Sequence, residues 1–144
     1  MAKKLYHGST KIIEGKLVPK KAEDLEKHPE NMIKAVYATD KKEIAIAMAI
    51  IGCKGVLGAS LINYKKGKPA GKIYIGWPKQ KYIYIYTLDK KYFKKSRGVK
   101  NQFISTKSVK PLKREKLIVR SYLHLIKRAS KKEIESWSKK YKNW

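Results

Sequence analysis

The residue types best suited to chemistry occur in three short segments that are spread over most of the chain. The first contains His7, Gly8 and Ser9, the second contains Tyr37, and the third contains Gln102. An imidazole and a hydroxyl can hydrogen-bond to a polar ligand. A glycine lets a ligand approach the backbone, and an aromatic ring offers a flat apolar surface. A strand-end histidine, a Gly-Ser turn and a core tyrosine are the structural alternatives, so each segment alone indicates little.

Taken together, the order and separation of the segments resemble the H-Y-E signature of the ADP-ribosyltransferase superfamily, in particular its poly(ADP-ribose) polymerase-like branch. The matching segments are Leu5-Tyr6-His7-Gly8-Ser9, Val36-Tyr37-Ala38-Thr39-Asp40 and Asn101-Gln102-Phe103-Ile104-Ser105. Small prokaryotic and viral proteins of this superfamily are also similar, through the opening segment, Phe103-Ile104-Ser105 and Ser108-Val109-Lys110-Pro111-Leu112. The resemblance covers about Leu5 to Leu117. It implies one α+β domain with split, bent antiparallel sheets around an NAD cleft, flanking helices and a helical C-terminal tail.

The resemblance also implies a role for each matching residue, with NAD as a substrate and no metal. His7 would bind a ribose, Gly8 would offer its backbone to the nicotinamide amide, and Ser9 would offer its hydroxyl to the adenosine ribose. Tyr37 would stack on the nicotinamide, and Gln102 would stand at the catalytic position. The candidate catalytic residues are therefore Gln102, His7 and Tyr37.

Two features depart from the family pattern. Gln102 replaces the catalytic glutamate, so a hydrogen bond is kept and a charge is lost, a difference on the order of 1–2 kcal/mol. In a gapless alignment, Ala45 and Met48 fall where the family has a serine that holds the nicotinamide amide and a second stacking tyrosine. Two hypotheses follow. One is an NAD-dependent enzyme that transfers a single ADP-ribose to a nucleic-acid or protein acceptor; the other is a catalytically inactive member of the fold that acts as a basic nucleic-acid-binding module.

The charge of the chain points to a polyanionic partner. The sequence has 36 Lys and Arg against 11 Asp and Glu, a formal net charge of +25, and proteins that neutralise phosphates bind nucleic acid through counterion release. Just before the third segment, aromatic residues alternate with cations, which suits stacking on single-stranded bases. The candidate nucleic-acid-binding residues are Lys91, Tyr92, Lys94, Lys95, Arg97 and Lys100. A solvated loop or a general lysine bias is the alternative, and no motif for sequence-specific reading of DNA is present.

The predicted elements place these segments on strands. Period-2 patterns and turn signals predict strands over 4–8, 34–38, 55–64, 72–76, 81–88, 101–105 and 112–120. An apolar stripe predicts a helix over about 41–51, with Asp40 as its N-cap. The tail is expected to hold two helices, the second opened by a capping box of Ser130 and Glu133. We expect an ADP-ribosyltransferase-like domain over 1–120 with a C-terminal helical extension over 121–144 packed on it. Residues 22–30, with four of the acids, are expected to form a polar surface loop or short helix.

Cysteine content and hydropathy narrow the class of protein. Cys53 is the only cysteine, which excludes an intramolecular disulfide and a cysteine-based zinc site and predicts a buried, inert thiol. The longest apolar stretch, Ile44 to Ile51, is well short of the roughly 20 residues that span a bilayer. The first residues also lack the apolar core of a signal peptide. We therefore expect a soluble cytoplasmic protein without a membrane partner. The sequence patterns give no basis for predicting the oligomeric state.

Overall fold

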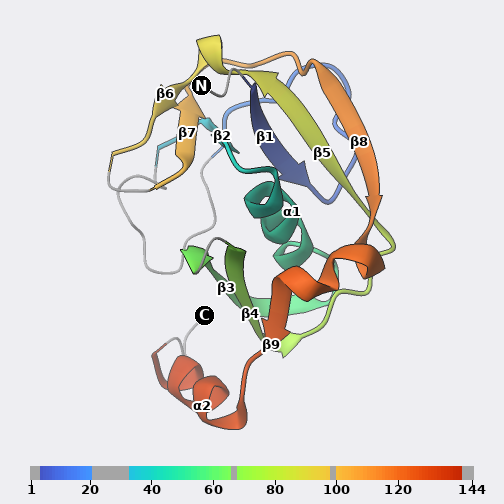
Figure 1. The fold of residues 1–144 in the computed structure, drawn as a ribbon, viewed down its shortest axis with the longest axis vertical. Coiled ribbons are helices and arrows are strands. Elements are labelled where there is room, and N and C mark those ends of the chain that lie inside the picture. Colours follow the sequence, from blue (N-terminus) through green and yellow to red (C-terminus); the bar gives the residue numbers. More distant parts are fainter. Residues whose placement is uncertain (1–3, 21–32, 66–67, 98–99, 141–144) are drawn as a thin grey trace.

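Two sheets lie on either side of one central helix (Figure 1). The structure, a computed structural model, describes residues 4–20, 33–65, 68–97 and 100–140. The larger sheet has the strand order β6-β7-β2-β1-β5-β8 and the smaller sheet has the order β3-β4-β9. The strands are β1 (Lys4–Ser9), β2 (Val36–Thr39), β3 (Val56–Lys65), β4 (Lys68–Gly76), β5 (Tyr82–Asp89), β6 (Lys94–Lys95), β7 (Gln102–Ser105), β8 (Lys113–Ile118) and β9 (Ile126–Arg128). The helices are α1 (Lys42–Ile51), α2 (Lys131–Lys140) and the 3₁₀ helices η2 (Lys90–Tyr92) and η3 (Val119–Leu125).

The α+β class expected from the sequence is confirmed: the described residues form one domain that contains two sheets and several helices. The strand pairs of the larger sheet are antiparallel, whereas β9 pairs with β4 in parallel. Within the described ranges, no helix is long and apolar enough to cross a membrane. The acidic segment over 22–30 lies outside the described residues.

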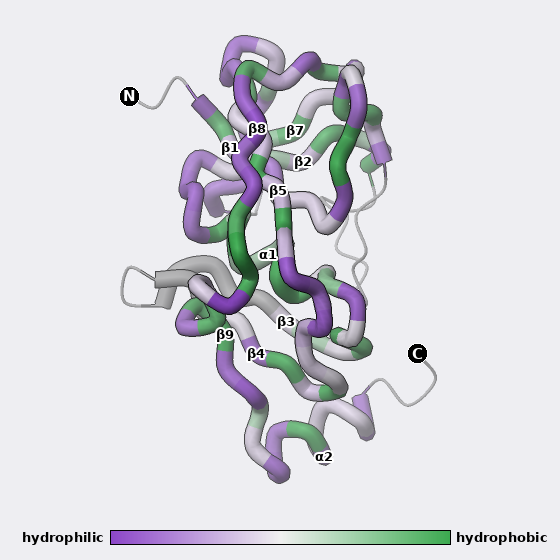
Figure 2. The backbone as a smooth tube through the Cα atoms, turned by 90° about the vertical axis from the view of Figure 1, so that its right-hand side faces the viewer, coloured by the Kyte–Doolittle hydropathy of each residue, from purple (hydrophilic) through white to green (hydrophobic). Residues whose placement is uncertain are grey.

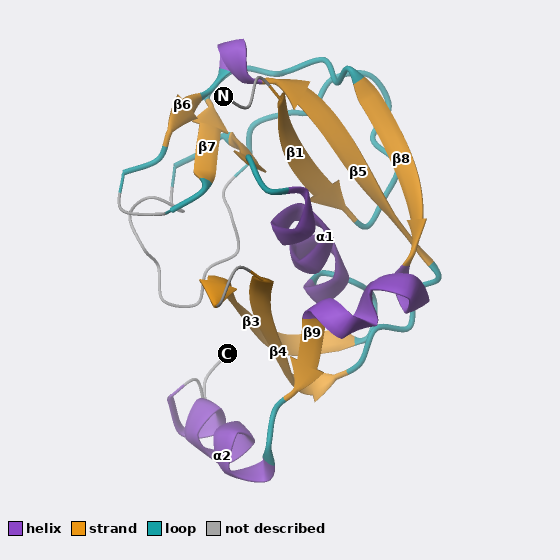
Figure 3. Cartoon of the chain, viewed as in Figure 1, coloured by secondary structure: helices purple, strands orange, loops and turns teal. Residues whose placement is uncertain are grey.

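Helix α1 fills the space between the two sheets, as Figure 3 shows. Its buried residues are Ile44, Ala45, Ile46, Ala47, Ala49 and Ile50. Because both sheets cover it, the helix is apolar on almost every side instead of along one stripe. Its alanines permit close approach to the larger sheet, and the helix predicted over 41–51 is confirmed. Cys53, just beyond the helix, is 2% exposed, so its predicted burial is also confirmed.

The start of α1 differs from the expectation. Lys41 occupies the N-cap position without a side-chain capping bond, so the predicted cap at Asp40 is wrong. The hydroxyl of Thr39 instead accepts a hydrogen bond from the backbone N–H of Lys41 at 3.1 Å. Asp40 Oδ1 accepts a hydrogen bond from Asn101 Nδ2 at 3.0 Å. Asp40 therefore ties the turn between β2 and α1 to the start of β7, a non-local contact that competes with capping.

The tail is not helical throughout. The sequence predicts a helix from Ser121, but residues 119–125 form η3 and residues 126–128 form β9, which pairs with β4 at Gly71, Lys72 and Ile73. The apolar residues of the expected stripe, such as Leu125 and Ile126, are buried in the same core as α1. Residues 126–128 therefore form backbone hydrogen bonds with β4 instead of the intrahelical hydrogen bonds of the predicted helix.

The second tail helix is confirmed as α2, together with its capping box. The N–H of Glu133 donates to Ser130 Oγ at 3.2 Å, and the N–H of Ser130 donates to Glu133 Oε1 at 3.0 Å. The ring of Trp137 stacks on Tyr74 of β4 with centroids 5.1 Å apart and planes at 8°. Glu133 is also paired with Lys72. Helix α2 therefore lies against the smaller sheet, at the far end of the molecule from β6 and β7 (Figure 3).

Candidate functional site

The three segments that could do chemistry lie on adjacent strands of the larger sheet. Strand β2 lies between β1 and β7, so the strands that carry His7, Tyr37 and Gln102 are neighbours. Thr39 of β2 is opposite Gln102 of β7 and opposite Tyr6 of β1. Long stretches of chain separate these residues, and antiparallel pairing brings them into one region of the sheet.

Strands β1 and β2 part soon after they meet. Strand β1 pairs with β5 at six positions, from Lys4 to Ser9, but it pairs with β2 only where Tyr6 meets Thr39. Figure 1 shows the consequence: β2, β7 and β6 turn away from β1, β5 and β8. The edge of β1 from His7 to Ser9 therefore faces the place where the sheet divides.

The side chain of His7 bridges this division. Its Nδ1 donates a hydrogen bond to the backbone carbonyl of Tyr37 at 2.6 Å. A carbonyl can only accept, so the proton is on Nδ1 and Nε2 carries a free lone pair. Burial lowers the pKa of His7, the positive charge of Lys20 lowers it further, and the bond to Tyr37 opposes both effects. His7 is thus neutral near pH 7 and is prepared to accept a hydrogen bond from a hydroxyl.

Gly8 lies directly under helix α1. A Cβ at this position would be 2.2 Å from the carbonyl oxygen of Ala45 and 2.9 Å from the Cβ of Ala49. The structure therefore brings together Gly8 and Ala45, two of the residues assigned to the nicotinamide. It also gives Gly8 a packing role, because only a residue without a side chain lets α1 come this close. Met48, one helical turn from Ala45, is 46% exposed.

Ser9 and Tyr37 both have local hydrogen-bond partners. Ser9 Oγ donates to the carbonyl of Lys11 at 2.8 Å and accepts from its N–H at 3.1 Å, which closes a turn at the end of β1. The hydroxyl of Tyr37 donates to the carbonyl of Ile33, and partial burial raises the pKa of this phenol. Neither contact requires a ligand, and the ring of Tyr37 is half-buried on its strand.

The faces of the strands sort the candidate residues into two groups. Directly opposite residues share a face of the sheet, and neighbours along a strand alternate. Tyr37 therefore shares a face with Thr39 and Gln102, which is the face covered by α1. His7 follows Tyr6 and belongs to the other face of β1. The parting of β1 and β2 lets the His7 imidazole reach the backbone carbonyl of Tyr37, whereas the side chain of Gln102 lies on the opposite face from His7.

The position of Gln102 is fixed by Ser96. Gln102 Nε2 donates to Ser96 Oγ at 3.1 Å, and the N–H of Ser96 donates to the carbonyl of Gln102 at 2.9 Å. The preceding residue, Asn101, has φ = 63°, a left-handed conformation that asparagine adopts more readily than most residues. Sequence reasoning missed Ser96 and gave Asn101 no role beyond its place in the matching segment, because the contacts of both residues are set by how separate segments pack. A serine six residues before the candidate position carries no signal of its own.

The predicted nucleic-acid-binding residues lie at one edge of the larger sheet, on or beside η2 and β6. Lys91, Lys94, Lys95, Arg97 and Lys100 are exposed, and Tyr92 is 55% exposed. Lys91 Nζ lies 5.0 Å from the centroid of the Tyr92 ring and 3.8 Å from Asp89 Oδ2. The structure thus brings these residues together. It also offers a structural reason for them, since lysines on an edge strand discourage pairing with another sheet.

Comparisons with known proteins add nothing to this geometry. No family model, no curated protein and no solved structure matches the chain. Among the side chains that the structure describes, no group of three or more His, Cys, Asp or Glu is arranged to hold a metal ion.

Proposed function

We propose that this chain is an ADP-ribosyltransferase-like protein that binds NAD where β1 and β2 part and transfers a single ADP-ribose to a nucleic-acid or protein acceptor in the cytoplasm. One observation carries the proposal. The three segments that resemble the superfamily signature lie on three adjacent strands, and the His7 imidazole bridges two of them at the split. If the likeness of the three short segments were accidental, nothing would require them to lie on adjacent strands.

The expected chemistry follows from the charge that develops on the substrate. Breaking the nicotinamide–ribose bond builds positive charge on the ribose, as in glycoside hydrolysis. The free Nε2 of neutral His7 can accept a hydrogen bond from a ribose hydroxyl and hold the sugar in place. Gln102 can orient the ribose through its amide, but it has no charge with which to stabilise the cation. We expect NAD binding with slow transfer, because preorganised charge is the larger part of such catalysis.

A restored carboxylate tests the proposal. In Gln102→Glu, the hydroxyl of Ser96 can rotate to donate to the carboxylate, so the fold tolerates the change. A charged hydrogen bond exceeds a neutral one by about 1–2 kcal/mol, which corresponds to a rise of roughly 5- to 30-fold in rate. Nicotinamide release from NAD, measured by chromatography, should rise by that factor. Ser136→Glu, the same change of charge at an exposed position of α2, is the control and should leave the rate unchanged. No nicotinamide from either the native chain or Gln102→Glu would contradict the proposal.

Specific observations favour a second candidate, a catalytically inactive member of the fold that acts as a basic nucleic-acid-binding module. Ala45 has no side-chain donor for the nicotinamide amide, Met48 is 46% exposed, and the amide of Gln102 is already bound to Ser96. This candidate predicts nucleic-acid binding that weakens steeply with salt and does not respond to NAD. Binding that persists unchanged at high salt, or that requires NAD, would count against it.

A further inference from the structure

The outer face of β5 and β8 carries a second group of aromatic and cationic residues, far from η2 and β6. We call it the Tyr82 face and define it by Lys81, Tyr82, Tyr84, Lys116 and Ile118. Strand pairing sets Tyr82 opposite Ile118 and Tyr84 opposite Lys116, so these four side chains share one face of the sheet. This is the face turned away from α1, because the alternate residues of β5, Ile83 and Ile85, are buried with the helix.

Part of this outer face is covered and part is open. The N–H of Ile13 donates to the hydroxyl of Tyr86 at 2.6 Å, so the segment after β1 lies over the outer face at Tyr86. Tyr86 is 1% exposed, whereas Tyr82 and Tyr84 are only half-buried, and Ile118 is 46% exposed. The rings of Tyr82 and Tyr84 are two residues apart on one strand, a step of roughly 6.7 Å. Tyr84 packs in part against the apolar cluster that contains Leu5, Leu17 and Tyr86, so Tyr82 is the more open ring and Tyr84 offers only part of its surface beside it.

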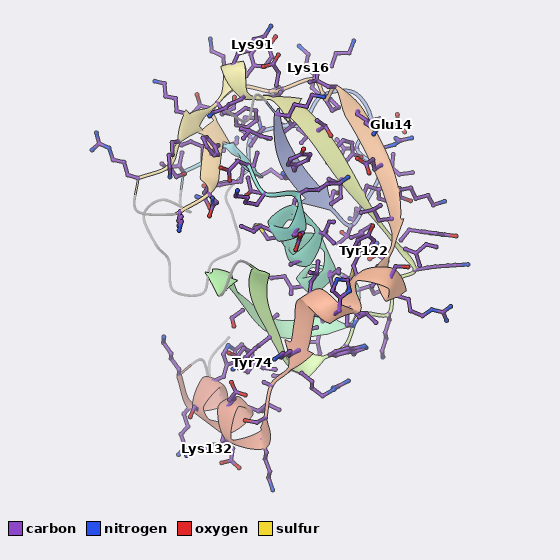
Figure 4. All side chains as sticks on the ribbon, viewed as in Figure 1. Glu14, Lys16, Tyr74, Lys91, Tyr122 and Lys132 are labelled. Carbon is purple, nitrogen blue, oxygen red and sulfur yellow. The ribbon has the colours of Figure 1, made fainter. Side chains whose placement is uncertain are left out.

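The charges of β8 are sorted between its two faces. Glu115 is opposite Ile85 and points toward α1, where both of its oxygens accept hydrogen bonds from Lys42 Nζ at 2.9 Å. Its neighbours Arg114 and Lys116 belong to the outer face, and both are exposed. The only acid of the strand is thus removed from this face. Nitrogen-tipped side chains fan out from β8 in Figure 4, and Figure 2, which views the molecule from the β8 side, shows hydrophilic and hydrophobic stretches along this strand.

The cations of the Tyr82 face are held next to its aromatic ring. Lys116 Nζ lies 4.0 Å and Lys81 Nζ 5.4 Å from the centroid of Tyr82. Neither lysine is paired with any of the described acidic side chains. At the β6 edge, by contrast, Lys91 is shared between Tyr92 and Asp89. An exposed cation–π contact is weaker than base stacking, so a phosphate can draw Lys116 aside and free the ring for a base.

We propose that the Tyr82 face binds single-stranded nucleic acid, with bases on Tyr82 and Tyr84 and phosphates on Lys81, Lys116 and Arg114. Aromatic side chains on an open sheet with flanking cations are the arrangement by which proteins bind unpaired bases. A duplex keeps its bases stacked and offers only phosphates to such a face. The proposal does not depend on the NAD site, because its residues belong to other strands and no step requires NAD.

Fluorescence anisotropy of a fluorescein-labelled 12-nucleotide oligo(dT), without NAD, tests this surface. Tyr82→Leu keeps an apolar side chain but removes the ring, and we expect it to weaken binding roughly 5- to 100-fold. Lys116→Gln should weaken binding and reduce the slope of log K against log salt by about 0.7. Lys132→Gln, the same change of charge at an exposed lysine of α2, is the matched control and should change the affinity by less than twofold.

Several results would overturn the proposal. They are an absence of binding to the oligonucleotide, equal affinity for a 12-base-pair duplex, unchanged affinity in Lys116→Gln, and a loss in Lys132→Gln as large as that in Lys116→Gln. Circular dichroism checks that each variant is folded. Lys116 is exposed, so Lys116→Gln decides the question even where Tyr82→Leu fails to fold. NAD titration of the same samples tests the proposed NAD site separately, so that either proposal can fail without the other.

Discussion

Replacing Gly8 with alanine tests the contact between β1 and α1, on which the geometry of the candidate site depends. The new Cβ would lie 2.2 Å from the carbonyl oxygen of Ala45, where ordinary contacts begin at 3.4 Å. Strand and helix would have to separate by about 1.2 Å at this point, the difference between these distances. The atom in the way belongs to the helix backbone, so no side-chain rotation relieves the clash. Helix α1 is itself held between two sheets and cannot move freely.

The cost of Gly8→Ala can be placed within a range. Overpacking a well-packed core costs typically 1–3 kcal/mol, and loss of the glycine's freedom in the unfolded chain returns about 0.4–1 kcal/mol. These two ranges leave a net loss between about 0 and 2.6 kcal/mol, and because the clash is with the helix backbone we expect roughly 1–2 kcal/mol. For a chain of 144 residues this lowers Tm by roughly 3–8 °C.

Thermal melting followed by circular dichroism measures this loss. Gly52→Ala is the matched control, because Gly52 has φ = −89° and the nearest atoms to an added Cβ lie 3.5–3.6 Å away. We expect its Tm to stay within about 2 °C of the native value. A Gly8→Ala variant that melts within 1 °C of the native chain would show that α1 does not press on β1 as described.

Three further predictions concern the pH dependence, the thiol and the tail. The lowered pKa of His7 means that its contribution to stability is complete above pH 6.5 and is lost as pH falls through the lower folded-state value. Between pH 7 and 5 the native Tm should therefore fall more steeply than that of His7→Asn, and equal slopes would contradict the buried neutral imidazole. Burial raises the pKa of Cys53 to about 11, so DTNB at pH 8 should react only after unfolding; a fast reaction in native buffer would be inconsistent with this. In Trp137→Ala, loss of the stack on Tyr74 should release α2, which is too short to be stable alone. Hydrogen exchange should then show unprotected α2 amides and protected α1 amides; protection of both would refute the docking.

Local patterns predicted the elements whose determinants are local. The helix over 41–51 follows from an apolar run bounded by glycine, and the start of α2 follows from the reciprocal bonds of Ser130 and Glu133. The strand predicted over 81–88 is β5, whose alternating tyrosines and isoleucines line its two faces. In each case the residues that determine the element lie within a few positions of each other in the sequence.

The remaining features depend on contacts between distant segments. Asp40 has the right sequence context for a cap, but Asn101 offers it a hydrogen bond from β7. The stripe around Leu125 and Ile126 fits a helix, yet β4 presents an open edge that takes this stretch as β9. At the candidate site, the sequence brought His7, Tyr37 and Gln102 together only through a family resemblance. Their adjacency comes from strand order, which no local pattern encodes.

Isothermal titration of the native chain with NAD, beside His7→Asn, tests the central claim most directly. We expect the native chain to bind NAD. We expect His7→Asn, which removes the acceptor at Nε2, to bind at least about fivefold more weakly, because one hydrogen bond contributes about 1 kcal/mol. No binding by the native chain, or the same Kd for both proteins, would contradict an NAD site where β1 and β2 part.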